Sequence, residues 1–223
     1  MAGLERMAPG RRGRRGRREY ASRALRKRFL IVCEGAVTEV AYFEAFPVSR
    51  EVRVVVRGEG KNTTSLVEAA VHHAEHACEE GEPFDQVWVV YDRDDFGAQK
   101  FNQADADVRT LDSKRPEQWR AAWSNQAFEL WYVLHFQFFD SKLHRHLLNE
   151  KLGELLRAAG HGAGYAKNDP RMYEVLLPLQ PKAIAHARRL ETEHGLARHT
   201  TLDSQNPSTK VFRLVEALND EIP

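Results

Sequence analysis

Acidic side chains follow two apolar segments of this 223-residue chain. Residues 29–33 are continuously apolar and run into Glu34, and residues 87–91 run into Asp92 and Asp94. Carboxylates that converge repel one another unless a cation neutralises them, and hard oxygen ligands with open water positions suit Mg²⁺ or Mn²⁺. If the fold brings Glu34, Asp92 and Asp94 together, they predict a site for one or two such ions.

The elements around these acids predict an α/β fold. Residues 29–33, 52–56 and 87–91 have the apolar or β-branched pattern of strands covered on both faces, and residues 38–46 and 64–80 between them are helical in pattern. This βαβαβ order indicates a parallel sheet, in which ligands bind beyond the carboxyl ends of the strands. The alternative is that the acids are ordinary strand-end and helix-cap residues.

The rest of the chain has a weaker pattern. Residues 96–118 resemble a polar helix, a short strand is expected at 121–123, and an apolar helix at 126–138. After residue 140 no segment predicts a strand. Helices are expected near residues 142–159, 171–177 and 182–194, and in a final helix that begins with Asn206 as cap and Pro207 in its first turn. We therefore expect three parts: a basic arm at 1–28, an α/β domain at 29–139, and a helical C-terminal extension at 140–223 packed on that domain.

The loop after the second predicted strand could bind a phosphate. Gly58 and Gly60 allow close approach of the backbone, and Lys61, Asn62 and Thr63 precede a predicted helix whose N-terminus favours an anion. The spacing does not match a Walker A loop, so ATP binding is not inferred. A simple turn followed by a helix cap explains the same residues equally well.

Other residues carry weaker chemical signals. Glu129 lies in a very apolar segment, where a carboxylate needs a partner or an exposed edge, so it is either a site residue or a helix-start residue. His135 lies about 240° further around that helix, so the two cannot aim at one point and His135 is expected to be structural. His72 and His76 have a spacing that can bind zinc, but a solvated helix face is the favoured interpretation.

Charge is divided sharply along the chain. The formal net charge is +1, yet residues 1–28 contain ten arginines, one lysine and two glutamates, a local net charge of +9, and the remainder has a net charge of −8. The segment 11–18 has low complexity and no apolar periodicity, which predicts an arm suited to the phosphate backbone of a nucleic acid. The alternatives are a solubilising tail or docking of the arm on the acidic body.

The number of cysteines and the hydropathy of the chain indicate the cellular compartment in which the protein is expected. Cys33 and Cys78 are too few for a metal cluster or a disulfide framework, and Cys33 in its apolar run is expected to be a buried, reduced thiol. Neither a membrane-spanning segment nor a secretory signal is recognisable, so we expect a cytoplasmic protein without membrane contact.

Taken in order, several motifs resemble those of a known family. An apolar strand that ends in Glu-Gly, followed 58 residues later by a strand that ends in Asp-x-Asp, is similar to the Toprim domain of topoisomerases, primases and related nucleases. The fuller set of motifs resembles the RloB-like family. These motifs are Ile31-Val32-Cys33-Glu34-Gly35, Thr38-Glu39, Tyr42-Phe43, Gly58-x-Gly60-Lys61-Asn62-Thr63, Asp92-Arg93-Asp94-Asp95-Phe96, Ser124-Asn125-x-x-Phe128-Glu129-Leu130-Trp131 and Asn206-Pro207-Ser208-Thr209.

The resemblance implies a fold and a function. It implies a Toprim-like parallel sheet flanked by helices, and a Mg²⁺-dependent nuclease of DNA or RNA in bacterial phage defence, working with an AAA-type ATPase. Glu34, Asp92 and Asp94 would hold the metal, with Glu34 alternatively a general acid or base. The other class that the residues allow is a non-catalytic subunit that binds nucleic acid or regulates such an ATPase.

Overall fold

The structure, a computed structural model, describes residues 27–61, 63–93, 97–142, 144–162, 164–167 and 169–223. Most of the predicted basic arm, and the predicted site residues Asn62 and Asp94, lie outside these ranges. Within them, no helix combines the length and the apolar character needed to cross a membrane.

Strands and helices alternate through the first half of the chain, as the sequence predicted. The elements in chain order are β1 (Lys27–Cys33), α1 (Thr38–Glu44), β2 (Val52–Gly58), α2 (Thr63–Glu79), β3 (Gln86–Asp92), α3 (Ala98–Lys114), β4 (Gln118–Asn125), α4 (Glu129–Phe136), α5 (Arg145–Ala158), α6 (Met172–Leu176), η1 (Leu177–Leu179), α7 (Gln180–Leu196), η2 (Leu202–Ser204), β5 (Ser208–Thr209) and α8 (Val211–Asn219). The protein is therefore α/β in class.

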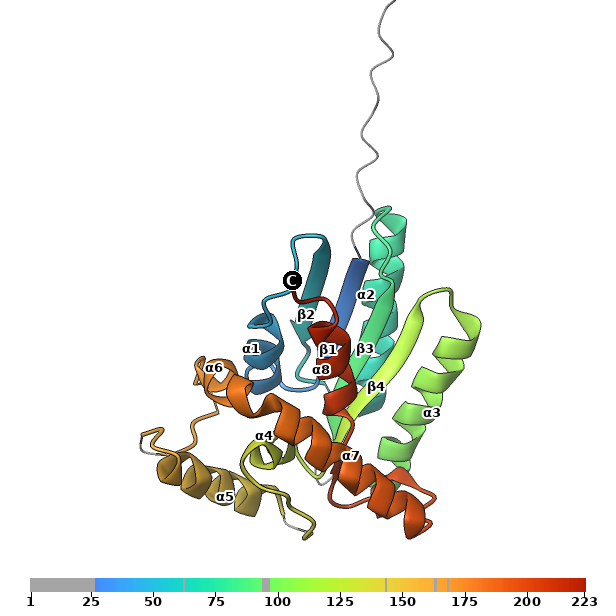
Figure 1. The fold of residues 1–223 in the computed structure, drawn as a ribbon. Helices are drawn as coiled ribbons and strands as arrows, with labels where there is room; N and C mark the ends of the chain where they lie inside the picture. Colours follow the sequence, from blue (N-terminus) through green and yellow to red (C-terminus); the bar gives the residue numbers. More distant parts are fainter. Residues whose placement is uncertain (1–26, 62, 94–96, 143, 163, 168) are drawn as a thin grey trace, which may run out of the picture.

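A five-stranded sheet with the order β2-β1-β3-β4-β5 forms the centre of the molecule (Figure 1). β1 to β4 are parallel, and only β5 runs antiparallel to its neighbour. The register aligns the carboxyl ends of the parallel strands, because Cys33 pairs with both Gly58 and Val90, and Asp92 pairs with Ser124. Side chains that follow β1 and β3 are thus delivered to one edge of the sheet.

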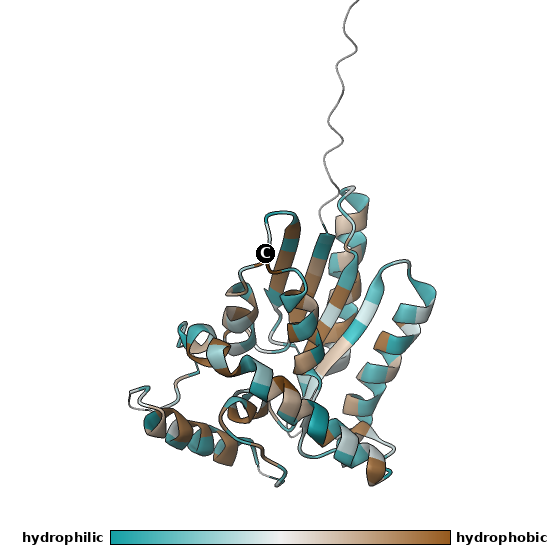
Figure 2. Ribbon diagram, in the orientation of Figure 1, coloured by the Kyte–Doolittle hydropathy of each residue, from teal (hydrophilic) through white to brown (hydrophobic). Residues whose placement is uncertain are grey.

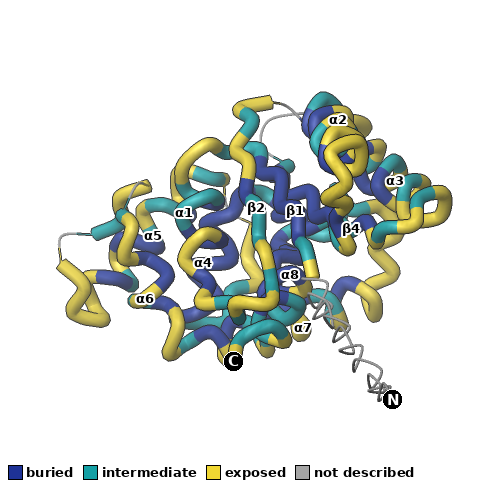
Figure 3. Tube along the Cα trace, turned by 90° about the horizontal axis from the view of Figure 1, so that it is seen from above, coloured by how far each residue is buried: buried dark blue, intermediate teal, exposed yellow. Residues whose placement is uncertain are grey.

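Helices cover both faces of the sheet (Figure 3). Successive side chains of a strand point to opposite faces, so Phe29, Ile31 and Cys33 join one apolar cluster while Leu30 and Val32 join the other. α2 and α3 pack on the second of these faces, whereas α1 and the helices from α4 onward contribute to the cluster on the first, with α5 packed against α4. Burial on both faces explains the apolar stretches of β1 and β3. In Figure 2 brown residues form the middle and end of β1, and in β3 they alternate with paler residues such as its aromatic ones.

The C-terminal part of the chain shares a core with the sheet. α4 is buried along its whole length from Glu129 to His135, and it packs against α5 and α7. A helix that is apolar on all sides must be covered on all sides. One hydrophobic cluster consequently joins Ile31 of β1 with Leu190 of α7 and Leu214 of α8.

Two expectations for the C-terminal part are wrong. A strand is present there, since Ser208 and Thr209 form β5, and the last helix begins at Val211 rather than at Asn206. The physical reason is pairing with β4: the Lys210 amide donates to the Trp123 carbonyl at 2.8 Å, which holds this segment extended. The hydroxyl of Thr209 then accepts from the amide of Val211 at 3.2 Å, the first amide of the helix.

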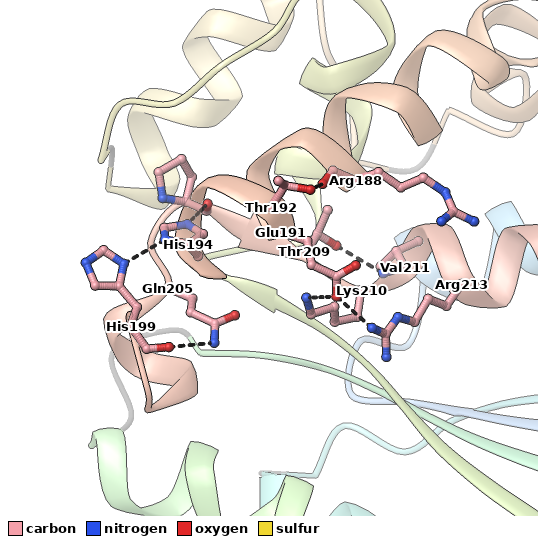
Figure 4. Close-up of polar contacts among 11 residues, drawn as sticks. Arg188, Glu191, Thr192, His194, His199, Gln205, Thr209, Lys210, Val211 and Arg213 are labelled. Carbon is pink, nitrogen blue, oxygen red and sulfur yellow. Dashed lines mark hydrogen bonds and ion pairs between the residues drawn. The ribbon is translucent and has the colours of Figure 1, made fainter. Parts of the chain in front are cut away.

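Ion pairs and a histidine–carbonyl contact connect the β5–α8 junction to α7 (Figure 4). Oε1 of Glu191 accepts from Nζ of Lys210 at 2.5 Å and from Nη2 of Arg213 at 2.6 Å. His194 Nε2 lies 2.7 Å from the carbonyl oxygen of Pro207. The predicted apolar stripe of α8, from Val211 to Leu218, is buried against the sheet and is confirmed.

A carboxylate pocket at the carboxyl edge of the sheet

A pocket of about 310 Å³ lies beyond the carboxyl ends of β1 and β3. Four carboxylates, from the β1–α1 loop, α1, β3 and α4, line it together with two cations. These charged residues are Glu34, Glu39, Asp92, Glu129, Arg145 and Lys167. The structure therefore brings three of the predicted site residues, Glu34, Asp92 and Glu129, into one pocket.

Glu34 and Asp92 are linked directly. The backbone amide of Asp92 donates to Oε2 of Glu34 at 3.2 Å, and the amide of Glu34 donates to the carbonyl of Val90 at 2.9 Å. Asp92, whose exposed fraction is only 8%, accepts at Oδ2 from the buried amide of Phe128 at 2.9 Å. One oxygen of each carboxylate is thus fixed by a backbone amide, which sets the orientation of both side chains.

Glu39 also lines the pocket, although in the sequence it stands out only as part of the Thr38-Glu39 motif. It is the second residue of α1 and is buried, and its carboxylate folds back over Gly35. A Cβ atom at Gly35 would lie 2.1 Å from Oε2 of Glu39. A side chain at position 35 would therefore displace this carboxylate from its place.

Gly58 has a similar role at the end of β2. A Cβ atom there would lie 2.7 Å from the Cα of Ala36 and 2.9 Å from the carbonyl oxygen of Gly35. These are backbone atoms, which cannot rotate away as a side chain can. The β1–α1 loop that carries the pocket can cross β2 only because this position has no side chain.

Glu129 begins α4, and its side chain is held from the C-terminal part of the chain. Its Oε1 accepts from the hydroxyl of Tyr165 at 3.1 Å and lies 3.9 Å from Nζ of Lys167. Burial raises the pKa of Tyr165 far above its ordinary value, and the negative charge of Glu129 raises it further. Tyr165 is therefore a permanent hydrogen-bond donor that orients Glu129.

Lys167 is positioned by its backbone. The hydroxyl of Thr38 donates to the carbonyl oxygen of Lys167 at 2.9 Å, which ties this segment to the first residue of α1. Arg145, the first residue of α5, also lines the pocket. The cations that border the carboxylates thus come from α5 and from the segment before α6.

The pKa of the Cys33 thiol reflects its burial and the negative charge of the nearby carboxylates. Burial raises the pKa of its thiol well above the ordinary value, and the carboxylates of Glu39 and Asp92 raise it further. The thiol is buried and free, as the sequence predicted. It remains protonated and does not act as a nucleophile.

The predicted phosphate loop lies beside Glu34 but not in the carboxylate pocket. The amide of Gly60 donates to the carbonyl of Glu34 at 3.0 Å, which fixes the β2–α2 loop against the β1–α1 loop. Nζ of Lys61 lies 2.9 Å from Oε2 of Glu59. Lys61 thus already has an anionic partner within its own loop, and His73 contacts the other oxygen of the same carboxylate at 2.6 Å.

Thr63, the last of the predicted phosphate-binding residues, is buried at the start of α2. It is the first residue of α2 and is fully buried, and its hydroxyl has no hydrogen-bond partner among the residues that the structure describes. Neither Lys61 nor Thr63 lines the carboxylate pocket. Their role toward a phosphate remains a prediction, and Asn62 lies outside the described residues.

Two carboxylates of the pocket, Glu34 and Asp92, are the residues that could hold a hard cation. Within the described ranges, no group of three or more Asp, Glu, His or Cys side chains is arranged to hold a metal ion, and Asp94 lies outside them. Glu34 and Asp92 nevertheless place hard oxygen donors in one pocket. Protein-bound Mg²⁺ keeps several waters and needs only one or two carboxylates.

The three histidines considered in the sequence, His72, His76 and His135, lie away from the carboxylate pocket. His135 is fully buried, with Nδ1 2.8 Å from the carbonyl oxygen of Trp131, and burial lowers its pKa to about 4. His72 and His76 stack with ring centroids 6.5 Å apart on the exposed side of α2. None of the three lines the carboxylate pocket.

Fold and pocket together define a class: an α/β protein whose architecture is consistent with a Toprim-like fold and whose parallel strands deliver acids to one edge. The model of the RloB-like protein family matches residues 29–218, and the chain belongs to that family. A search of the curated proteins and a search of the solved structures gave no significant match.

Part of the pocket has no signal in the sequence. Arg145 and Lys167, which line the pocket, and Tyr165, which donates to Glu129, lie in a region where the sequence shows no strand pattern or motif. The packing of α4 against α5 and α7 joins this region to the rest of the fold. The one signal for Glu39 is its place in the Thr38-Glu39 motif, shortly after Glu34-Gly35.

Proposed function

We propose that this protein is a Mg²⁺- or Mn²⁺-dependent nuclease that cleaves phosphodiester bonds of DNA or RNA. The observation that supports this most is the convergence of Glu34, Glu39, Asp92 and Glu129 in one pocket bordered by Arg145 and Lys167. Four carboxylates in about 310 Å³ repel one another, and a divalent cation relieves that repulsion. A bordering pair of cations suits the phosphate of a nucleic acid.

The residues divide into three roles in this proposal. Glu34 and Asp92 would hold the ion, with Asp94 as a further ligand. When bound, such an ion polarises the scissile phosphate and lowers the pKa of an attacking water. Arg145 and Lys167 bind the oxygens of the phosphate, while Glu39 and Glu129 remain to accept or donate a proton.

Membership of the RloB-like family also supports a proposal for the cellular role of the protein. We propose that the nuclease acts in the bacterial cytoplasm during phage defence, together with an AAA-type ATPase, as the RloB-like resemblance implies. The buried reduced thiol of Cys33 and the exposed free thiol of Cys78 are compatible with a reducing compartment.

A second candidate function is a non-catalytic subunit that binds nucleic acid. The observation in its favour is that Glu34 and Asp92 each accept a hydrogen bond from a backbone amide, at 3.2 and 2.9 Å. Carboxylates that cap amides can be retained for structural reasons alone. In that case Arg145 and Lys167 balance the acids without any chemistry.

Purified protein incubated with plasmid, single-stranded DNA and RNA, with and without Mg²⁺ or Mn²⁺, separates the two functions. The nuclease predicts metal-dependent cleavage of at least one substrate, abolished in both Glu34→Gln and Asp92→Asn. Asp105→Asn is the matched control, because Asp105 has the same 8% exposed fraction as Asp92 but lies outside the carboxylate pocket. Binding without turnover on every substrate would favour the non-catalytic subunit.

A further inference from the structure

A larger groove lies at the opposite, amino edge of the sheet. Its volume is about 640 Å³, and it is formed by the C-terminal end of α2 and the turns that lead into β3 and β4. Its floor is apolar and includes Cys78, Pro83 and Phe84. Its rim is acidic, with the carboxylates of Glu75, Glu79, Asp85 and Glu117. Arg115 also lines the groove, and its Nη2 lies 2.6 Å from Oε1 of Glu75.

The basic N-terminal segment meets the fold at this groove. The amide of Arg28 donates to Oδ2 of Asp85 at 2.7 Å, and its guanidinium Nη1 lies 2.8 Å from Oε2 of Glu82. The same guanidinium is 5.2 Å from the centre of the Phe84 ring. Phe84 and Asp85 both line the groove. The last arginine of the basic segment is therefore already bound at the groove's rim.

We propose that this groove binds the chain's own basic arm, residues 1–26. The arm carries nine arginines and two glutamates, which complements an acidic rim with a single cation. Its arginines can repeat along the groove the contacts that Arg28 makes at the rim: an ion pair with a carboxylate and stacking on an aromatic ring. A docked arm withholds its arginines from any phosphate backbone.

The connection makes such docking effective at modest intrinsic affinity. Because the arm is joined through Lys27 to Arg28, which contacts the groove residue Asp85, its effective concentration at the groove is about millimolar. The attraction between exposed charges is screened by salt, with a Debye length of about 10 Å at 0.1 M. Docking is therefore expected at low salt and release at high salt.

Cys78 provides a direct probe of the groove. It is exposed and lines the groove, whereas the only other cysteine, Cys33, is buried. The rate of alkylation of Cys78 by neutral iodoacetamide is measured on the full chain across pH, so that the rate constant of the thiolate is separated from the fraction ionised. At low salt the full chain should react at least about threefold more slowly than a full-length variant in which the six arginines of 11–18 are glutamine.

Matched charge variants locate the contact. Glu75→Gln/Glu79→Gln removes two exposed carboxylates at i,i+4 on the groove rim, and Glu150→Gln/Glu154→Gln removes two at the same spacing on α5. The first pair should abolish the protection of Cys78 and the second should leave it unchanged. Salt near 1 M should equalise the rates of all four proteins.

Two outcomes would overturn the proposal. One is an equal thiolate rate constant for the full chain and the glutamine arm variant at low salt. The other is protection that grows with protein concentration, since it would assign the groove to the arm of a second copy. Neither measurement depends on nuclease activity.

Discussion

At the scale of single residues, Asp92 combines the two roles that the sequence left open. The sequence predicted its position because β3 ends at the carboxyl edge of a parallel sheet, where Glu34 also emerges. It could not predict that Oδ2 would accept the buried amide of Phe128, since that contact depends on how the chain turns from β4 into α4. Asp92 is therefore a pocket carboxylate and a structural acceptor at once.

Substitutions at Asp92 separate these roles. Asp92→Ala leaves the amide of Phe128 without its acceptor and should lower the free energy of unfolding by about 1–3 kcal/mol. Asp92→Asn keeps an acceptor oxygen and removes a like charge beside Glu34, so the metal-free variant should be as stable as the wild type or slightly more so. Urea unfolding in chelator measures both, and equal losses in the two variants would contradict the assignment.

The same proteins test the metal. Mg²⁺ should raise the melting temperature of the wild type, because it binds the assembled pocket and not the unfolded chain. Asp92→Asn should respond much less, and the control Asp105→Asn should respond like the wild type. Equal shifts in all three proteins would remove Asp92 from the cation site.

Gly35 is predicted to be required for the position of Glu39. In Gly35→Ala the new Cβ would lie 2.1 Å from Oε2 of Glu39, so this carboxylate, the end of a flexible side chain, must turn away, at a cost of about 0.5–1.5 kcal/mol. Glu39→Ala removes the obstacle, so the double variant should be more stable than the sum of the two single losses predicts. Gly97→Ala is the control, since a Cβ there meets nothing within 4 Å. Additive losses in unfolding experiments would show that the two residues are not coupled.

At the scale of elements, the apolar strands and the final apolar stripe were predictable, and the short pairings were not. β1 and β3 are recognisable because burial on both faces demands an unbroken apolar sequence. β5 has only two residues, and it is a strand because Ser208 and Thr209 pair with the end of β4. Such a pairing is a property of the folded chain and leaves no periodicity in the sequence.

α4 illustrates how burial also fixes a protonation state. His135 is fully buried in this helix, and its pKa falls from an ordinary 6.5 to about 4, chiefly through burial. Between these values the unfolded chain binds a proton that the folded chain does not. The stabilisation is therefore complete above pH 6.5 and is lost as the pH falls toward 4, by an amount on the order of 3 kcal/mol.

This predicts a difference between two proteins across pH. The free energy of unfolding of the wild type should fall more steeply from pH 6.5 to 4 than that of His135→Leu, which has no imidazole to protonate at this position. Urea unfolding at a series of pH values measures the difference. His161→Gln, at an exposed histidine that water hydrates in both states, is the control and should parallel the wild type. Parallel curves for the wild type and His135→Leu would refute the argument.

At the scale of the whole molecule, the carboxylate pocket and the attachment point of the basic N-terminal segment lie at opposite edges of the sheet. The carboxylate pocket follows the carboxyl ends of β1 and β3, whereas the basic segment joins the fold at Lys27, the amino end of β1. A seven-residue strand spans about 20 Å, so Arg28 at the start of β1 and the pocket beyond its end are separated by roughly that length. An arm of 26 residues can nevertheless span this distance several times over when extended, at about 3.3 Å per residue.

The last prediction concerns this arm and a nucleic acid. Removing residues 1–24 should weaken binding and flatten the plot of log K against log salt, since each phosphate contact contributes about 0.9 to the slope. The fold should persist, because Lys27 and Arg28 keep their contacts with Glu221 and Asp85. Replacing the six arginines of 11–18 by lysine preserves charge and should preserve the slope, whereas replacing them by glutamine should reproduce the truncation. If the arm also docks at the acidic groove, Glu75→Gln/Glu79→Gln should tighten binding at low salt, because a competing partner of the arm is lost. Fluorescence anisotropy with a labelled oligonucleotide measures all five proteins, and a slope that the glutamine variant leaves unchanged would show that the arm does not contact nucleic acid.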